Sequence, residues 1–268
     1  MKYRLLILFT ILFLLLAWHL NTITEDAYIS FRYAWHFAEG LGFRWNPGDP
    51  PVEGFTNFMW TMILAGMHIL GLDMEITSRI LGLIFAVSTL VVVWCMAGRY
   101  CSGGRWWKYT GAVFLALSPP FASWASSRLE TAMFTFLVTL GIFLYFIFYE
   151  TGKYRFLWSV ILLSAALTRP EGLLFFIILA IHLLITQKFN KNNIITLLPF
   201  IVPFILFEIW RIIYFGEFLP NIFYAKTGFT SAMFLRGLKY TLKFFLVTAV
   251  PILGILTLFR LRKPWGLI

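Results

Sequence analysis

The chain has 268 residues, 60% of them hydrophobic, and its mean hydropathy of +0.82 excludes an ordinary soluble domain. Its formal net charge of +10 does not indicate a nucleic-acid partner, because the basic residues cluster in short gaps between apolar runs. The composition therefore predicts an all-α polytopic membrane protein, since a chain in lipid satisfies its backbone hydrogen bonds within helices.

Eight apolar runs along the chain are candidates for membrane spans. They cover residues 5–20, 76–97, 109–124, 131–149, 156–169, 172–187, 194–214 and 238–259. A signal peptide is an alternative for residues 1–20, but the small-residue cleavage site of such a peptide is missing. We predict that these runs form one helical bundle within a single domain, 1–268.

The run from Asn57 to Leu72 is ambiguous, and the charges favour one placement for it. If it crosses the bilayer, the basic loop 98–108 falls outside and every later basic loop changes sides. If it lies in the interface, all five basic clusters fall in the cytoplasm, and of the 12 acidic residues only Glu150 is left inside. We predict the second arrangement, with the N-terminus inside and a long outer loop over residues 21–75.

Residues 26–40 of this outer loop have the pattern of an amphipathic helix lying on the membrane. At 100° per residue, one apolar face carries Ala34, Ala38, Phe31, Trp35 and Tyr28. A second face carries Asp26, Ser30 and Tyr33. Gly40 and Gly42 end the helix, and residues 52–57 lead into the second interfacial helix. A plain surface anchor is the alternative interpretation of residues 26–40.

Acidic and basic side chains gather at the outer ends of the apolar runs. An acidic pair at a membrane surface, such as Glu25 and Asp26, is energetically unfavourable unless water solvates it, a cation pairs with it or it has a function. Structural ion pairs are one reading of the later charges, above all for Glu208 and Arg211, which are three residues apart. Their convergence on one side instead suits a lipid substrate with a phosphate head. The candidate site residues are Glu25, Asp26, Arg32, His36, Glu53, Arg128, Glu130, Arg169, Glu171, Asn221 and Lys226.

The chemistry that such a set permits is sugar transfer from a polyprenyl-phosphate donor. A carboxylate takes the proton from the acceptor hydroxyl as it attacks the anomeric carbon. Arg or Lys stabilises the phosphate that leaves. A divalent cation could help to bind the phosphate, held by carboxylate oxygens, and the sequence does not decide whether a metal is needed. Arg128, Arg169 and Lys226 are predicted to line one basic pocket near Asp26.

Several motifs of the outer loop and of the later helix ends strongly resemble GT-C glycosyltransferases, in the same order along nearly the whole chain. The closest group is the mycobacterial terminal arabinofuranosyltransferases that use decaprenylphosphoryl-arabinose. The matching segments are 25–33 (EDAYISFRY), 39–42 (EGLG), 45–48 (WNPG), 52–57 (VEGFTN), 127–131 (SRLET), 168–172 (TRPEG) and 219–226 (LPNIFYAK).

The resemblance implies a GT-C-like bundle that performs inverting transfer on the extracytoplasmic face of the plasma membrane, onto a glycan, lipid or protein acceptor. It implies Asp26 as the general base, with Glu25 where many relatives have Asp. Family members are usually longer, so the C-terminal soluble domain is expected to be absent here. Arabinose is not carried over as the sugar. A polyprenyl-linked sugar transporter or flippase, or a non-catalytic partial homologue, is the alternative, although a transporter would place its polar groups near the bilayer midplane.

Overall fold

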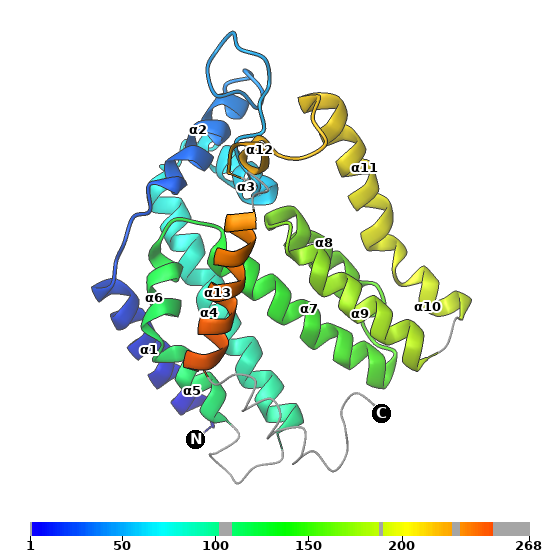
Figure 1. The fold of residues 1–268 in the computed structure, drawn as a ribbon. Helices are drawn as coiled ribbons and strands as arrows, with labels where there is room; N and C mark the ends of the chain where they lie inside the picture. Colours follow the sequence, from blue (N-terminus) through cyan, green and yellow to red (C-terminus); the bar gives the residue numbers. More distant parts are fainter. Residues whose placement is uncertain (1, 102–108, 188–189, 227–230, 249–268) are drawn as a thin grey trace.

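The computed structural model describes residues 2–101, 109–187, 190–226 and 231–248, and these form helices and no strands (Figure 1). The predicted all-α class is therefore confirmed for the described part. The helices are α1 (Lys2–His19), α2 (Asp26–Ala38), α3 (Phe58–Ile69), α4 (Met74–Tyr100), α5 (Thr110–Ala116), α6 (Pro119–Ser126), α7 (Thr131–Thr151), α8 (Leu157–Thr168), α9 (Gly172–Thr186), α10 (Lys191–Ile195), α11 (Leu198–Phe215), α12 (Asn221–Lys226) and α13 (Ser231–Thr248).

Three helices, α4, α7 and α11, are long and apolar enough to cross a membrane, and α1, α3, α8 and α9 are shorter apolar helices. The predicted span 109–124 is wrong as a single helix, because Pro119 follows Ser118 and disfavours helical backbone there, so α5 and α6 are separate. The predicted span 238–259 is only partly described, since residues 249–268 lie outside the described part. The number of spans stays a prediction.

Rows of exposed apolar side chains support a membrane location. On α9 the exposed isoleucines 178, 181 and 185 recur at helical spacing, as do Ile205, Ile209 and Ile213 on α11. Such continuous apolar faces are unfavourable in water and are what a helix presents to lipid. The helices that carry them are therefore those expected to face the bilayer.

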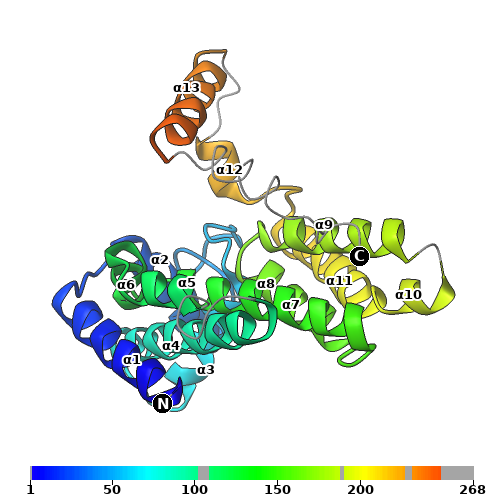
Figure 2. The same ribbon diagram turned by 90° about the horizontal axis from the view of Figure 1, so that it is seen from below.

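The interior of the bundle consists of several aromatic and aliphatic clusters. Around α7, α8 and α9, which lie side by side in Figure 1, the buried rings of Tyr145 and Trp158 pack together, and Phe176 of α9 stacks on Phe200 of α11 at 3.7 Å between ring centroids. A second cluster joins α1, α4 and α6. Helices α2 and α3 lie at one end of the bundle, next to the start of α7 and the end of α8 (Figure 1). The second view shows α12 and α13 standing apart from it (Figure 2).

The amphipathic helix predicted at 26–40 is present as α2, but part of its apolar face packs against protein. Phe31 and Ala34 are buried against Trp60 of α3 and neighbouring core residues. Tyr28 and Trp35, expected on the same stripe, are exposed. The expected stripe on the membrane is therefore wrong for Phe31 and Ala34, because helical periodicity identifies an apolar face without distinguishing protein from lipid as its partner.

The segment between α2 and α3 is held onto α11 by aromatic packing. The rings of Phe43 and Phe55 pack with Phe215, and the Phe43 N–H donates to the Tyr214 hydroxyl at 3.0 Å. Gly42 has φ +76, in the left-handed region, and a Cβ there would lie 2.5 Å from that hydroxyl. Glycine is therefore required at this contact by both conformation and space.

We predict that residues 57–72 do not cross the bilayer; α3, with 12 residues, would reach only about 18 Å, against a hydrocarbon core of about 30 Å. The free, exposed cysteines Cys95 and Cys101 are first replaced by serine. In intact cells an impermeant thiol reagent should then label Glu217→Cys from outside and leave Lys153→Cys unlabelled; both positions are exposed. The reverse labelling pattern would contradict the predicted topology.

Candidate active site

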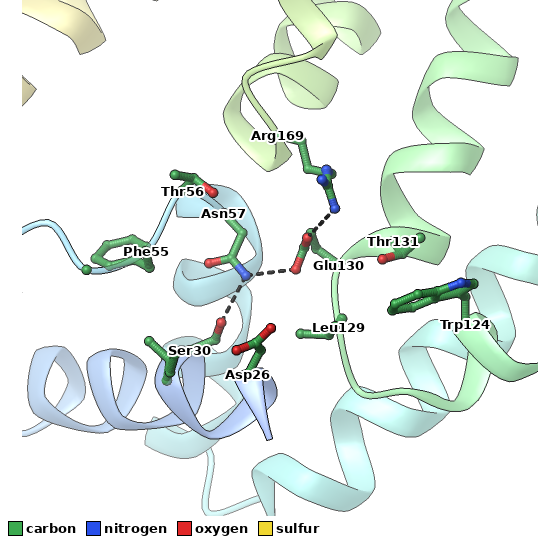
Figure 3. A pocket seen from close by; sticks show the side chains of 12 residues that line it. Asp26, Ser30, Phe55, Thr56, Asn57, Trp124, Leu129, Glu130, Thr131 and Arg169 are labelled. Carbon is green, nitrogen blue, oxygen red and sulfur yellow. Dashed lines mark hydrogen bonds and ion pairs between the residues drawn. The ribbon is translucent and has the colours of Figure 1, made fainter. Parts of the chain in front are cut away.

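A cleft of about 480 Å³ opens where α2, α3, α6, α7 and the turn between α8 and α9 meet (Figure 3). Four segments that are far apart in the sequence supply its walls. The lining residues are Asp26, Ile29, Ser30, Gly54, Phe55, Thr56, Asn57, Trp124, Leu129, Glu130, Thr131 and Arg169.

The buried side chain of Asn57 joins the walls of the cleft. Its amide group donates to the Ser30 hydroxyl at 2.9 Å and to the Glu130 carboxylate at 2.8 Å (Figure 3). Its amide oxygen accepts from the Thr61 hydroxyl at 3.1 Å. Asn57 is also the N-cap residue of α3, but its side chain makes no capping bond. A residue type favoured for capping thus has its side chain committed to the cleft instead.

Glu130 is fixed from its other side by Arg169. The Arg169 Nη1 lies 3.0 Å from Glu130 Oε1, and Glu130 is buried. Arg169 also pairs with Glu171 at 3.0 Å, and its side chain remains 36% exposed. Gly172 closes this turn, since a Cβ there would lie 2.4 Å from the Ala166 backbone nitrogen. The Arg169 guanidinium therefore reaches the cleft on a tightly packed turn while keeping an open side.

Asp26 differs from Glu130 in having no fixed partner. Its side chain is exposed at the start of α2, and Figure 3 shows it next to Ser30 and facing the region of Glu130. Within the described part of the chain, no hydrogen bond or ion pair involves its carboxylate. The N-cap position belongs to Glu25, which makes no capping bond and does not line the cleft. Asp26 is thus a carboxylate whose lone pairs are available to a bound molecule.

Three of the predicted site residues, Asp26, Glu130 and Arg169, meet in this cleft, whereas Arg32 and His36 are used elsewhere. Arg32 donates to the Trp45 carbonyl at 2.7 Å and lies 4.4 Å above the Trp45 ring. The His36 Nδ1 lies 2.7 Å from the Arg44 carbonyl oxygen, and the ring is buried. Both side chains hold the segment after α2 and do not line the cleft, and their assignment to substrate binding stays a prediction.

The prediction that Arg128 contributes to the same basic pocket is wrong. The Arg128 Nη1 donates to the Asn21 side chain at 2.9 Å and to the backbone carbonyls of Thr22 and Ser126 at 2.5 and 2.9 Å. Its Nη2 lies 3.6 Å from the Glu75 carboxylate. The side chain is buried and φ is +66, in the left-handed region that non-glycine residues seldom adopt. Arg128 therefore ties the end of α1 to the turn before α7.

We expect Arg128→Gln to lower the free energy of unfolding by about 2–3 kcal/mol, because the charged hydrogen bonds from this buried side chain to Asn21, Thr22 and Ser126 are lost. Arginine and glutamine would adopt the same left-handed backbone at position 128, so the backbone strain should not change. Thermal and denaturant unfolding in detergent would measure the loss, and the donor KM of the folded variant should stay at the wild-type value. A variant of wild-type stability with a much raised donor KM would restore Arg128 to substrate binding.

Glu53 likewise makes a structural ion pair, and its assignment to substrate binding stays a prediction. Its carboxylate lies 2.7 Å from Arg211 Nη1, and both side chains are buried. Arg211 pairs in addition with Glu208 at 2.9 Å and donates to the Phe218 carbonyl. Burial raises the pKa of Glu53, and its hydrogen bond with Arg211 opposes that rise. The pair joins the segment before α3 to α11, and the suggested structural role of Glu208 with Arg211 is extended to Glu53.

Of the remaining predicted residues, Glu171 and Asn221 do not line the cleft. Glu171 is exposed and paired with Arg169. Asn221 begins α12, and its backbone N–H donates to the Glu53 carbonyl at 3.1 Å. Lys226 is the last residue of α12, and its side chain lies outside the described residues. Arg169 is thus the one predicted cation that reaches the cleft in the described part of the chain.

A second hollow, of about 350 Å³, lies next to the cleft and shares Thr56 with it. Its lining is largely apolar, apart from Glu53, Glu208 and Arg211 at one end. The apolar lining residues are Phe58, Ala166, Leu167, Pro170, Leu173, Phe204, Phe207, Leu219 and Pro220. A polar cleft and an apolar groove are therefore neighbours on the same side of the α8–α9 turn.

The sequence reasoning did not select Ser30, Asn57, Thr56, Thr131 or Trp124 as site residues. Ser30 follows Asp26 by four residues and so shares its predicted helix face, and that spacing is a usable signal. Asn57 lies where a helix begins, so its type is explained by capping alone. Nothing local distinguishes a capping asparagine from one that crosslinks a site.

The described residues contain no group of three or more His, Cys, Asp or Glu side chains placed to hold a metal ion. The cleft supplies two carboxylates, Asp26 and Glu130. This is the donor set with which Mg²⁺ is commonly held together with substrate phosphates. These two side chains are the ones that would hold a divalent cation here.

Comparisons of this chain with protein-family models, with curated proteins and with solved structures found no match.

Proposed function

We propose that this protein is a GT-C-type membrane glycosyltransferase that moves a sugar from a polyprenyl-phosphate donor to a cell-envelope acceptor, with Asp26 as general base. The observation that carries the proposal is the unpartnered Asp26 carboxylate in a cleft whose opposite wall holds the anchored Glu130–Arg169 pair. A free base facing a fixed cation suits a reaction in which a proton is removed as an anion departs. The resemblance of the outer-loop motifs to the GT-C family supports the same chemistry.

In the proposed step, the acceptor hydroxyl lies between Asp26 and the anomeric carbon of the donor. The Asp26 carboxylate accepts the hydroxyl proton while the oxygen forms the new glycosidic bond. The bond between the anomeric carbon and the phosphate oxygen breaks, and its electron pair leaves with polyprenyl phosphate. Attack from the side opposite the leaving group inverts the anomeric configuration.

Arg169 is proposed to receive the donor phosphate. Its guanidinium already bonds two carboxylates, Glu130 and Glu171, and the second of these is exposed. Exchange of Glu171 for phosphate oxygens would keep the Glu130 bond and retain a bidentate geometry. Glu130, tied to Asn57, would then keep Arg169 aimed into the cleft. Its role in the proposal is therefore positioning, and Asp26 is left as the base.

The apolar groove beside the cleft suits the first isoprene units of the donor. It is lined by rings and aliphatic side chains, among them Leu173, Phe204 and Phe207, and it meets the cleft at Thr56. A lipid tail in the groove would place its phosphate at the end nearest Arg169. Burial of the tail would also supply binding energy away from the reacting atoms.

The proposal is tested with purified protein in liposomes, a panel of polyprenyl-phosphate sugars and a lipid extract as acceptor. The expected result is acceptor-dependent release of polyprenyl phosphate, with a product of inverted anomeric configuration by NMR. A transporter would instead move the intact donor across a sealed bilayer without cleaving it. Donor translocation with no sugar transfer for any donor of the panel would overturn the proposed function.

A further inference from the structure

The seam between α1 and α4 carries a positive charge that no acidic residue neutralises. Arg79, on α4, has no hydrogen-bond or ion-pair partner in the described ranges, and its Nε is buried without a partner. Glu75 stands one turn earlier on the same helix, the arrangement that favours an ion pair. The Glu75 carboxylate is instead occupied by Arg128, at 3.6 Å, and by the Tyr28 hydroxyl, at 3.2 Å.

Two guanidinium groups therefore stand near one carboxylate, and only Arg128 pairs with it. Burial lowers the pKa of Arg128, Glu75 opposes the change, and Arg79 adds to it, as expected for like charges close together. The Arg128 Nη1 is engaged by backbone and side-chain oxygens, and its Nη2 pairs with Glu75, although its Nε is buried without a partner. The surplus charge consequently resides on Arg79, which is the more accessible of the two.

Arg79 is oriented by an exposed tryptophan. Its guanidinium lies 4.8 Å from the centroid of the Trp18 ring, and Trp18, near the end of α1, is 73% exposed. Stacking on an aromatic ring leaves the N–H fork of an arginine free at its edges. Tryptophan is also the residue type that accumulates at membrane–water interfaces. The pair thus forms a cationic group with one aromatic wall near the outer ends of both helices.

An exposed apolar row follows α4 past this pair, beginning one turn before Arg79. Ile76, Ile80 and Ile84 recur every four residues and are each more than half exposed. On α1, Leu15 is likewise exposed on the way to Trp18. An unpaired charge beside a lipid-facing apolar row is unfavourable unless an anion accompanies it. The fork of an arginine and the apolar row together match a phosphate group with hydrocarbon chains attached.

From this arrangement we infer that Arg79 and Trp18 form a binding site for the phosphate of an anionic membrane phospholipid, with its acyl chains along Ile80 and Ile84. None of these residues lines the cleft or the apolar groove, so the site is separate from the proposed donor site. The inference does not depend on the proposed transfer reaction. The bound phospholipid would hold the contact between α1 and α4, and with it Arg128, in place in an intact bilayer.

The test titrates the detergent-purified full chain with phosphatidylglycerol and measures binding by native mass spectrometry and by the shift in melting temperature. We expect saturable binding to the wild type and about tenfold weaker binding to Arg79→Gln, the size of effect expected when one charge-assisted hydrogen bond is lost. Arg155→Gln is the matched control: Arg155 also lies over an aromatic ring, Phe156, but already donates to the Asn192 carbonyl. It should bind phosphatidylglycerol as the wild type does.

Two further ligands test the acyl chains and the phosphate separately: diacylglycerol with the same chains, and inorganic phosphate alone. Each should stabilise the wild type less than phosphatidylglycerol. If Arg79→Gln does not fold, Arg79→Lys and Trp18→Leu provide the comparison, and both should weaken lipid binding. Equal binding of phosphatidylglycerol by wild type and Arg79 variants would overturn the inference. Equal stabilisation by diacylglycerol, or by inorganic phosphate alone, would also overturn it.

Discussion

Asp26→Asn is expected to reduce sugar transfer by two to four orders of magnitude, roughly the contribution of a general base, with little loss of stability. The Asp26 side chain has no partner to lose among the residues described, and asparagine is nearly isosteric with it. The amide cannot accept the hydroxyl proton, so kcat should fall while the donor KM changes little. Initial rates with the active donor from the panel, together with a melting curve, measure both effects.

Glu25→Gln is the matched control for this experiment, since it removes the neighbouring negative charge. Glu25 is exposed and does not line the cleft, so its variant should keep most of the activity. A stable Asp26→Asn protein that transfers sugar at the wild-type rate would remove Asp26 from the mechanism. Glu130, the other carboxylate of the cleft, would then be the next base to test.

The local features of the outer loop could be predicted well from the sequence. The helix expected at 26–40 corresponds to α2, and the short helix expected at 57–72 corresponds to α3. The expected shared face of Asp26 and Ser30 is the part of α2 that lines the cleft. Such predictions depend on capping, glycine positions and periodicity, which act within a few residues.

The partners of the charged side chains could not be predicted in the same way. Arg128 and Arg169 both stand beside a glutamate at an outer helix end, yet one binds backbone oxygens and the other reaches the cleft. The difference between them lies in tertiary contacts, because Arg128 adopts a left-handed backbone and its side chain points toward Asn21 and Thr22. Contacts between residues more than a hundred positions apart leave no periodic signal in one sequence.

A large stability effect is expected at the Glu53–Arg211 pair. Arg211→Met should lower the free energy of unfolding by about 3–5 kcal/mol, because removing one partner of a buried pair leaves the other without compensation. Glu53→Gln should cost less, since glutamine still accepts from Arg211 and the Glu208 contact at 2.9 Å remains. Denaturant unfolding in detergent measures both variants.

The double variant Glu53→Met/Arg211→Met decides whether the pair is structural. Burial raises the pKa of Glu53 despite its hydrogen bond to Arg211, so the folded environment favours the ionised carboxylate less than water does. Two apolar side chains should therefore recover much of the stability that Arg211→Met loses. Arg99→Met provides the control, because the Arg99–Glu150 pair has a similar distance, 2.9 Å, but is far more exposed and should contribute little. A double variant that regains stability and keeps the donor KM would confirm that Glu53 holds the outer loop on α11; a regained fold with a strongly raised donor KM would instead return Glu53 to substrate binding.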